Sequence, residues 1–131
     1  MRDINLIVIH CSDSDNPKHD NAQTIDIWHK QRKFKKIGYQ FFIQKNGTIE
    51  IGRKLREVGA HTKGFNTASI GICFSGKEDF TDEQKISGRI LIQGLLKEFN
   101  LSIIDVLAHN ELNKNKTCPN FPISEIFQVG L

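Results

Sequence analysis

The sequence predicts an α/β fold in which a central mixed β-sheet is flanked by helices. Short apolar runs rich in β-branched residues, at positions 4–9 and 69–74, are typical of buried strands. The pair Asn46-Gly47 stands between two apolar segments, which is the strongest short signal for a β-hairpin. A longer segment with helical periodicity spans residues 82–99. Helices on both faces of a sheet would bury these apolar runs.

The bulk composition is that of one folded globular domain, expected to span residues 1–131. Hydrophobic residues make up 38% of the chain and charged residues 25%, a balance unlike that of disordered or membrane proteins. The longest apolar runs are too short to span a bilayer, so no membrane insertion is expected. The N-terminus lacks the apolar core of a signal peptide, so we expect the protein to be cytoplasmic as synthesised.

Charge and cysteine content bear on partners and on redox state. The net charge of +3 suits a polyanionic surface such as a cell wall. No block of basic residues is interleaved with aromatic ones, so a nucleic-acid partner is not expected. Three cysteines without a secretory signal predict reduced thiols rather than a disulfide framework.

The first predicted strand ends in a histidine that is followed by a polar loop. Because side chains alternate across a strand, His10 and Cys11 should face opposite sides and cannot easily bind one metal ion. If His10 is a metal ligand, Cys11 therefore belongs to the core. The plainer alternative is that His10 only forms local hydrogen bonds.

A helix over residues 24–34 and the hairpin follow. Apolar residues at helical spacing give the helix a partly apolar face. In the first strand of the hairpin, Tyr39, Phe41 and Ile43 are predicted to share one face. On strand context alone, Tyr39 would be a half-buried strand aromatic.

The segment after the hairpin combines a loop and a long helix. A glycine-rich loop at residues 58–66 is typical of a surface or binding rim, and it contains His61 and Asn66. Thr81 and Gln84 then fit the two ends of a helix capping box. The helix is expected to turn five apolar residues toward the core, namely Ile86, Ile90, Leu91, Leu95 and Phe99.

The last predicted strand, residues 103–108, leads into a second strand-end histidine. Cys118 lies nine positions after His109 and shares its loop with Lys116. Imidazole and thiolate are both zinc ligands, and His10 would supply a third. Three protein ligands leave one tetrahedral position for water or substrate, as in catalytic zinc sites, whereas structural sites are usually closed by four.

Short sequence blocks in a specific order extend over nearly the whole chain. They are residues 9–12, 28–30, 38–53, 59–66, 69–72, 108–111 and 116–119. Their order and spacing resemble the zinc-dependent N-acetylmuramoyl-L-alanine amidases of type 2, the family of the phage lysozymes and the peptidoglycan-recognition proteins. The resemblance implies hydrolysis of the amide bond between the lactyl group of N-acetylmuramic acid and the L-alanine of the stem peptide.

The resemblance also implies the functional residues. One Zn²⁺ ion per chain would be bound by His10, His109 and Cys118. Tyr39 would orient the attacking water, and Lys116 would stabilise the oxyanion. The implied partner is peptidoglycan or a muropeptide, bound by a monomer. The sequence is consistent with two settings. The protein could be a phage lysin that reaches the wall on lysis, or an enzyme that recycles wall fragments inside the cell.

Some features leave alternatives open. His61 and Asn66 are expected, by the same resemblance, to line the substrate cleft. The one departure from the family pattern is Gln40, where histidine is common, and its side chain should point away from Tyr39. The domain could instead bind peptidoglycan without cleaving it, although such relatives characteristically lack the cysteine ligand. It could also be a structural zinc protein closed by His61 or Cys11.

Overall fold

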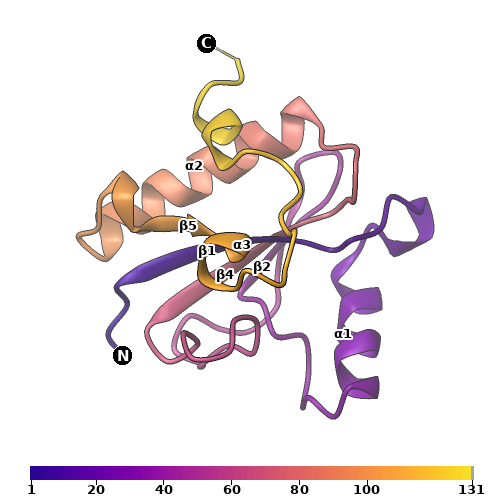
Figure 1. The fold of residues 1–131 in the computed structure, drawn as a ribbon, viewed down its shortest axis with the longest axis horizontal. Coiled ribbons are helices and arrows are strands. Elements are labelled where there is room, and N and C mark those ends of the chain that lie inside the picture. Colours follow the sequence, from indigo (N-terminus) through magenta and orange to yellow (C-terminus); the bar gives the residue numbers. More distant parts are fainter. Residues whose placement is uncertain (131) are drawn as a thin grey trace.

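The computed structural model describes residues 1–130 and arranges them around a five-stranded mixed sheet (Figure 1). The last residue of the expected domain, Leu131, lies outside the described residues. The strand order is β3-β2-β4-β1-β5, with four parallel strands and β3 antiparallel to β2 at one edge. The strands are β1 (Leu6–Cys11), β2 (Phe41–Ile43), β3 (Ile49–Ile51), β4 (Ser69–Phe74) and β5 (Val106–Ala108).

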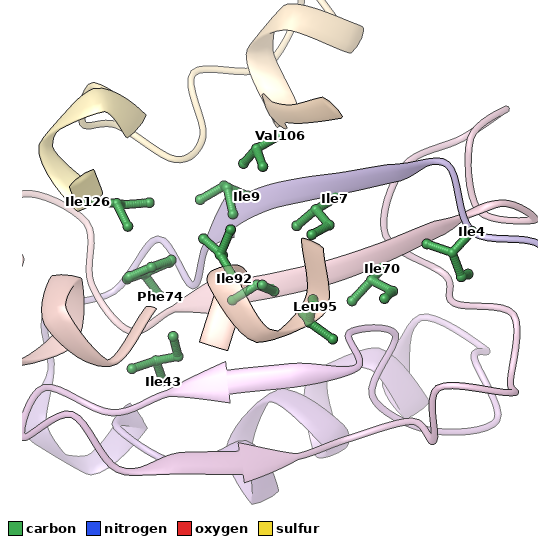
Figure 2. Packing of buried hydrophobic residues seen from close by; sticks show 11 residues of the cluster. Ile4, Ile7, Ile9, Ile43, Ile70, Phe74, Ile92, Leu95, Val106 and Ile126 are labelled. Atoms are coloured by element: carbon green, nitrogen blue, oxygen red, sulfur yellow. The ribbon is translucent and has the colours of Figure 1, made fainter. Parts of the chain in front are cut away.

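Helices cover both faces of this sheet, as the sequence predicts. Helix α2 (Asp82–Glu98) and the C-terminal 3-10 helix (Ile123–Phe127) lie on one face, and α1 (Ala22–Gln31) lies on the other (Figure 1). A short helix, α3 (His109–Leu112), follows β5 directly. The main core lies between the sheet and α2 (Figure 2), and its buried side chains are Ile4, Ile7, Ile9, Ile43, Ile70, Ile72, Phe74, Ile92, Leu95, Val106 and Ile126.

A smaller apolar cluster lies on the α1 side of the sheet. Its buried members are Ile25, Ile37, Phe42 and Cys73. Side chains alternate along β1, so Ile9 points into the main core and His10 points toward the smaller cluster on the α1 side. Among residues 1–130, no helix has the length and apolarity needed to cross a membrane.

Two local signals in the sequence are confirmed. Asn46-Gly47 turns the β2–β3 hairpin, and Gly47 has a φ of 89°, a left-handed conformation that favours glycine. Thr81 and Gln84 form the capping box. The N–H of Gln84 donates to Oγ1 of Thr81 over 3.1 Å, and the N–H of Thr81 donates to Oε1 of Gln84 over 2.9 Å.

The predicted core face of α2 is partly wrong. Ile90 is 64% exposed, whereas Ile92 is fully buried. The buried row runs through Gln84, Gly88 and Ile92, which are spaced four residues apart. Gln84 tolerates burial because its side-chain amide donates to two backbone carbonyls at the ends of β2 and β4, over 3.1 and 2.7 Å. A pattern of apolar residues alone cannot identify a face built partly from glutamine and glycine.

Several element boundaries also differ from the predictions. Strand β1 covers Leu6–Cys11 rather than residues 4–9, and α1 ends at Gln31 rather than at residue 34. Residues 103–105 form a 3-10 helix rather than the start of a strand, and Ile104 is 79% exposed. Helix α1 begins at Ala22, two residues earlier than predicted, because Asn21 caps it. The side-chain oxygen of Asn21 accepts the N–H of Thr24 over 2.8 Å.

Tyr39 does not share a face with Phe41 and Ile43. Phe41 and Ile43 contact the main core, whereas Tyr39 packs with Phe42 in the α1-side cluster. Strand β2 begins only at Phe41, so strict alternation does not extend back to position 39. Tyr39 therefore stands on the same side of the sheet as His10, and the two ring centroids are 4.9 Å apart.

Candidate active site

The open end of β1 positions the first site residues. Strand β5 pairs only with Ile7, Val8 and Ile9, so the last two residues of β1 have no strand neighbour on that side. Cys118 fills the place of the missing strand, because its Sγ accepts the backbone N–H of Cys11 over 2.8 Å. The cysteine of the last loop is thereby fixed beside the end of β1.

Helix α3 positions the second histidine and holds the loop that carries the cysteine. His109 is the first residue of α3 and follows β5 without a break. The backbone N–H of Asn110 donates to the carbonyl of Cys118 over 3.0 Å, and its side-chain amide donates to the carbonyl of Thr117 over 3.2 Å. These bonds fold the segment after α3 back onto the carboxyl ends of β1 and β5, where ligand sites of α/β sheets commonly lie.

His10, His109 and Cys118 come together as a group that could hold a metal ion. One ligand atom from each lies within 4.8 Å of the others. Nδ1 of His109 is buried and, within the described chain, has no hydrogen-bond partner. A buried nitrogen without a partner is costly unless something binds it, so this atom fits a metal ligand. Two imidazoles and one thiolate are a donor set that suits zinc.

Protonation at the site favours metal binding by the two histidines. Burial and the neighbouring histidines hold the pKa of His10 well below its usual value, so its ring is neutral at neutral pH. Burial, together with Lys116, also lowers the pKa of His109. The Cys11 thiol and burial raise the pKa of the Cys118 thiol. A bound cation acts in the opposite direction and deprotonates a coordinating thiol.

Cys11 lies outside the three-ligand group of the described residues, as the alternation along β1 predicts. Its side chain is buried, with 4% of its surface exposed. Its thiol lies next to Cys118. The pKa of Cys11 is lowered, and the hydrogen bond with the Cys118 side chain is the main cause.

His109 and Cys118 of the three-ligand group line a cleft of about 840 Å³. Each of the four other predicted site residues, Tyr39, His61, Asn66 and Lys116, lines it. Tyr39 is half-buried, and burial raises its pKa well above the usual value, so the phenol is neutral and can donate a hydrogen bond. Lys116 is exposed on the cleft wall.

The loop residues His61 and Asn66 have partners within the protein. Oδ1 of Asn66 accepts the backbone N–H groups of His61 and Thr62, each over 2.9 Å. The His61 ring points at His10, with 2.8 Å between Nδ1 of His61 and Nε2 of His10. Burial lowers the pKa of His61 to about 3, so this ring is neutral as well.

Gln40, the one expected departure from the pattern of the resembled family, has a packing role. The side chain is fully buried. Its Oε1 accepts the N–H of Gly71 in β4 over 2.8 Å, and its Nε2 donates to the carbonyl of Glu57 over 3.0 Å. Gln40 thus joins β4 to the loop that leads to His61.

The sequence predictions missed the wall of the cleft formed by α1 and the residues after it. Trp28, His29, Arg32 and Phe34 all line the cleft, as do Asn113, Asn115 and Thr117 on the opposite segment. One signal in the sequence is the partly apolar face of the predicted helix, which fits a core face equally well. The other is that residues 28–30 and 116–119 belong to the family-like sequence blocks. His29 has a structural role, because its Nδ1 accepts the backbone N–H of Gly38 over 2.8 Å.

His29 predicts a pH dependence of stability. Burial lowers its pKa from 6.5 to about 4. The unfolded chain therefore binds more protons between these values, and the free energy of unfolding falls as the pH drops through this window. For His29 alone we expect a loss of roughly 2 kcal/mol from pH 7 to pH 5.

Urea denaturation in a metal chelator measures this effect. His29→Asn keeps an acceptor for the Gly38 N–H but does not titrate, so its stability should decline less steeply between the two pH values. Equal slopes for the two proteins would show that His29 does not contribute.

Comparison with known proteins identifies the family. The model of the N-acetylmuramoyl-L-alanine amidase family matches residues 1–121 of this chain. The chain belongs to the N-acetylmuramoyl-L-alanine amidase family. The endolysin of Escherichia phage T7 is similar to this amidase, with 35% identity over 125 residues that cover 89% of this chain and 81% of that protein.

Solved structures agree with this assignment. The N-acetylmuramoyl-L-alanine amidase LysC from Clostridium intestinale URNW superposes with a TM-score of 0.86 at 36% identity, covering 97% of this amidase and 85% of that chain. Drosophila PGRP-LB superposes with a TM-score of 0.76 at 23% identity, covering 91% and 76% of the two chains, which is a likeness of fold. The fold is therefore that of the type 2 amidases and the peptidoglycan-recognition proteins.

Proposed function

We propose that this amidase cleaves the bond between the lactyl group of N-acetylmuramic acid and the L-alanine of the stem peptide, using one Zn²⁺ ion. The observation that carries the proposal is the group of His10, His109 and Cys118 at the cleft, with Nδ1 of His109 buried and unpartnered in the described structure. Zinc held by three such ligands supplies an activated water near neutral pH and polarises a carbonyl.

The surrounding residues would support hydrolysis of an amide. Tyr39, close to His10, is neutral and would orient the attacking water by a hydrogen bond. The proton that the water loses would pass by way of the Tyr39 hydroxyl to the leaving amine nitrogen, so that the phenol ends neutral. The ammonium group of Lys116 would stabilise the negative charge that develops on the former carbonyl oxygen. His10 and His109 would stay neutral ligands throughout, since burial opposes their protonation.

The charge of the cleft favours an anionic substrate. Arg32, Lys63 and Lys116 line it from three different segments, and Asp13 is the only acidic residue among the described lining residues. None of these three cations forms a salt bridge with an acidic residue in the described part of the chain. Arg32 lies over the ring of Phe34, 5.0 Å from its centroid. Stem peptides carry free carboxylates that such cations would bind.

Replacing Arg32 with glutamine should therefore weaken substrate binding. We expect kcat/KM for a soluble muropeptide to fall about twofold to fivefold, chiefly through KM. Arg56→Gln is the matched control, because Arg56 is exposed and lies outside the cleft lining, so it changes the net charge equally. Equal losses in the two variants would mean that only overall charge matters.

The setting follows from the relatives and is part of the proposal. The chain would act as a monomeric catalytic domain, without a nucleic-acid partner, on peptidoglycan or its fragments. Because the similar T7 protein is an endolysin, we infer synthesis in the cytoplasm and release to the wall on lysis.

Mass spectrometry of a defined muropeptide tests the proposed reaction. The purified protein would be incubated with the muropeptide in the presence of zinc and again after chelation. We expect zinc-dependent release of a free stem peptide that begins with L-alanine. A muropeptide that binds the protein but stays intact would refute hydrolysis and identify a recognition domain.

A further inference from the structure

The loop between β3 and β4 places a histidine against one member of the three-ligand group. Nδ1 of His61 lies 2.8 Å from Nε2 of His10, and the two rings meet edge to face with centroids 4.8 Å apart. The other ring nitrogen of His61, Nε2, lies 3.2 Å from Oγ of Ser69. Both nitrogens of His61 therefore have partners inside the protein.

Two glycines create the space that the His61 ring occupies. A Cβ atom on Gly71, within β4, would lie 2.7 Å from the ring, and one on Gly59 would lie 2.6 Å from it. Glycine inside a strand weakens a sheet, and it often marks a place where another group must approach closely. Here that group is the His61 ring.

We propose that His61 is a positioning residue that fixes the His10 ring for metal binding. The inference rests on the proposed zinc site. If the N–H at Nε2 of His10 donates to His61, Nδ1 of His10 is unprotonated and free to be the ligand. Nδ1 of His61 then accepts from His10, and the N–H at Nε2 of His61 donates to Oγ of Ser69. One choice of neutral tautomers thus satisfies the hydrogen bonds among His10, His61 and Ser69.

A positioning role for His61 and direct substrate contact affect different measured quantities, namely the metal affinity and KM. A residue that only contacts substrate changes KM and leaves the metal affinity unchanged. A residue that orients a ligand and sets its tautomer changes the metal affinity, typically by about 10- to 100-fold when it is removed. Zinc affinity therefore separates the two roles without any measurement of activity.

Competition with a chromophoric chelator would measure zinc affinity for the wild type and three variants. His61→Leu removes the nearer acceptor, 2.8 Å from Nε2 of His10, and leaves only Oγ1 of Thr62 at 3.3 Å, so affinity should fall about 10- to 100-fold. His61→Asn can place its side-chain oxygen near the Nδ1 position and should keep most of the affinity. His61→Gln fills the space of the His61 ring, but its longer side chain carries the amide past the Nδ1 position. It should therefore lose zinc affinity as His61→Leu does, and it provides the same test if His61→Leu fails to fold.

The control is His19→Leu, which removes a histidine outside the cleft lining and should stay within about twofold of the wild type. Wild-type zinc affinity in both His61→Leu and His61→Gln, with a raised KM, would overturn the positioning role and assign His61 to substrate contact. A wild-type protein that binds zinc but releases no stem peptide would refute the proposed function and leave this comparison intact.

Discussion

Replacing Cys118 with serine is expected to remove zinc and amidase activity together. The thiolate is the only anionic ligand of the proposed set, and a serine hydroxyl is a poor substitute at neutral pH. We expect zinc affinity to fall more than about 100-fold, since loss of a direct ligand exceeds loss of its supporting contacts. Elemental analysis after gel filtration and turnover of a soluble muropeptide would measure the two effects on one sample.

Cys11→Ala is the matched control for this variant. Cys11 is the neighbouring thiol, but it lies outside the three-ligand group of the described chain. The alanine variant should retain one zinc ion per chain. A Cys118→Ser protein that keeps stoichiometric zinc and full activity would contradict the ligand assignment, and loss of zinc from Cys11→Ala would make Cys11 a ligand.

Lys116→Ala should separate catalysis from metal binding. Lys116 is exposed on the cleft wall and is not part of the three-ligand group, so zinc content should be unchanged. Loss of one oxyanion-stabilising donor typically lowers kcat by about 100- to 1000-fold, which is about 2.7–4 kcal/mol in the activation free energy. Steady-state kinetics on zinc-loaded protein would measure the loss.

Lys114→Ala controls for the loss of a lysine from the same loop. Lys114 is exposed and does not line the cleft. Its removal should leave kcat within about twofold, in the range of surface substitutions away from a site. A normal kcat in Lys116→Ala would remove Lys116 from the mechanism.

The local features of the fold could be predicted because single residues determine them. Asn46-Gly47 needs only the left-handed conformation of glycine to specify the hairpin turn. Thr81 and Gln84 satisfy each other's backbone groups within one helical turn. The fold class followed from such elements and from the apolar runs between them.

Features that depend on distant contacts could not be predicted in this way. Ile92 rather than Ile90 is buried because Gln84 and Gly88 set the contact face of α2, and their fit is visible only against the sheet. His61 and His10, which are 51 positions apart in the chain, can meet only because Gly71 leaves space for the His61 ring. The wall formed around Arg32 likewise arises only when α1 docks on the sheet.

The same distinction applies to the three-ligand group. Residue types suggested a metal site, and the resemblance to a family selected its members, but neither explained how they meet. They meet because β5 is short, which leaves the backbone of Cys11 open to Cys118. No pattern in residues 103–108 indicated that half of that run would form a 3-10 helix.

Hydrolysis by this protein depends on an open coordination position at the metal. X-ray absorption spectroscopy of the zinc-loaded protein would test it most directly. We predict one sulfur ligand at about 2.3 Å, two imidazole nitrogens at about 2.0–2.1 Å and one oxygen from water. A closed shell with a second sulfur, from Cys11, or a third imidazole, from His61, would contradict the catalytic role and indicate a structural zinc site.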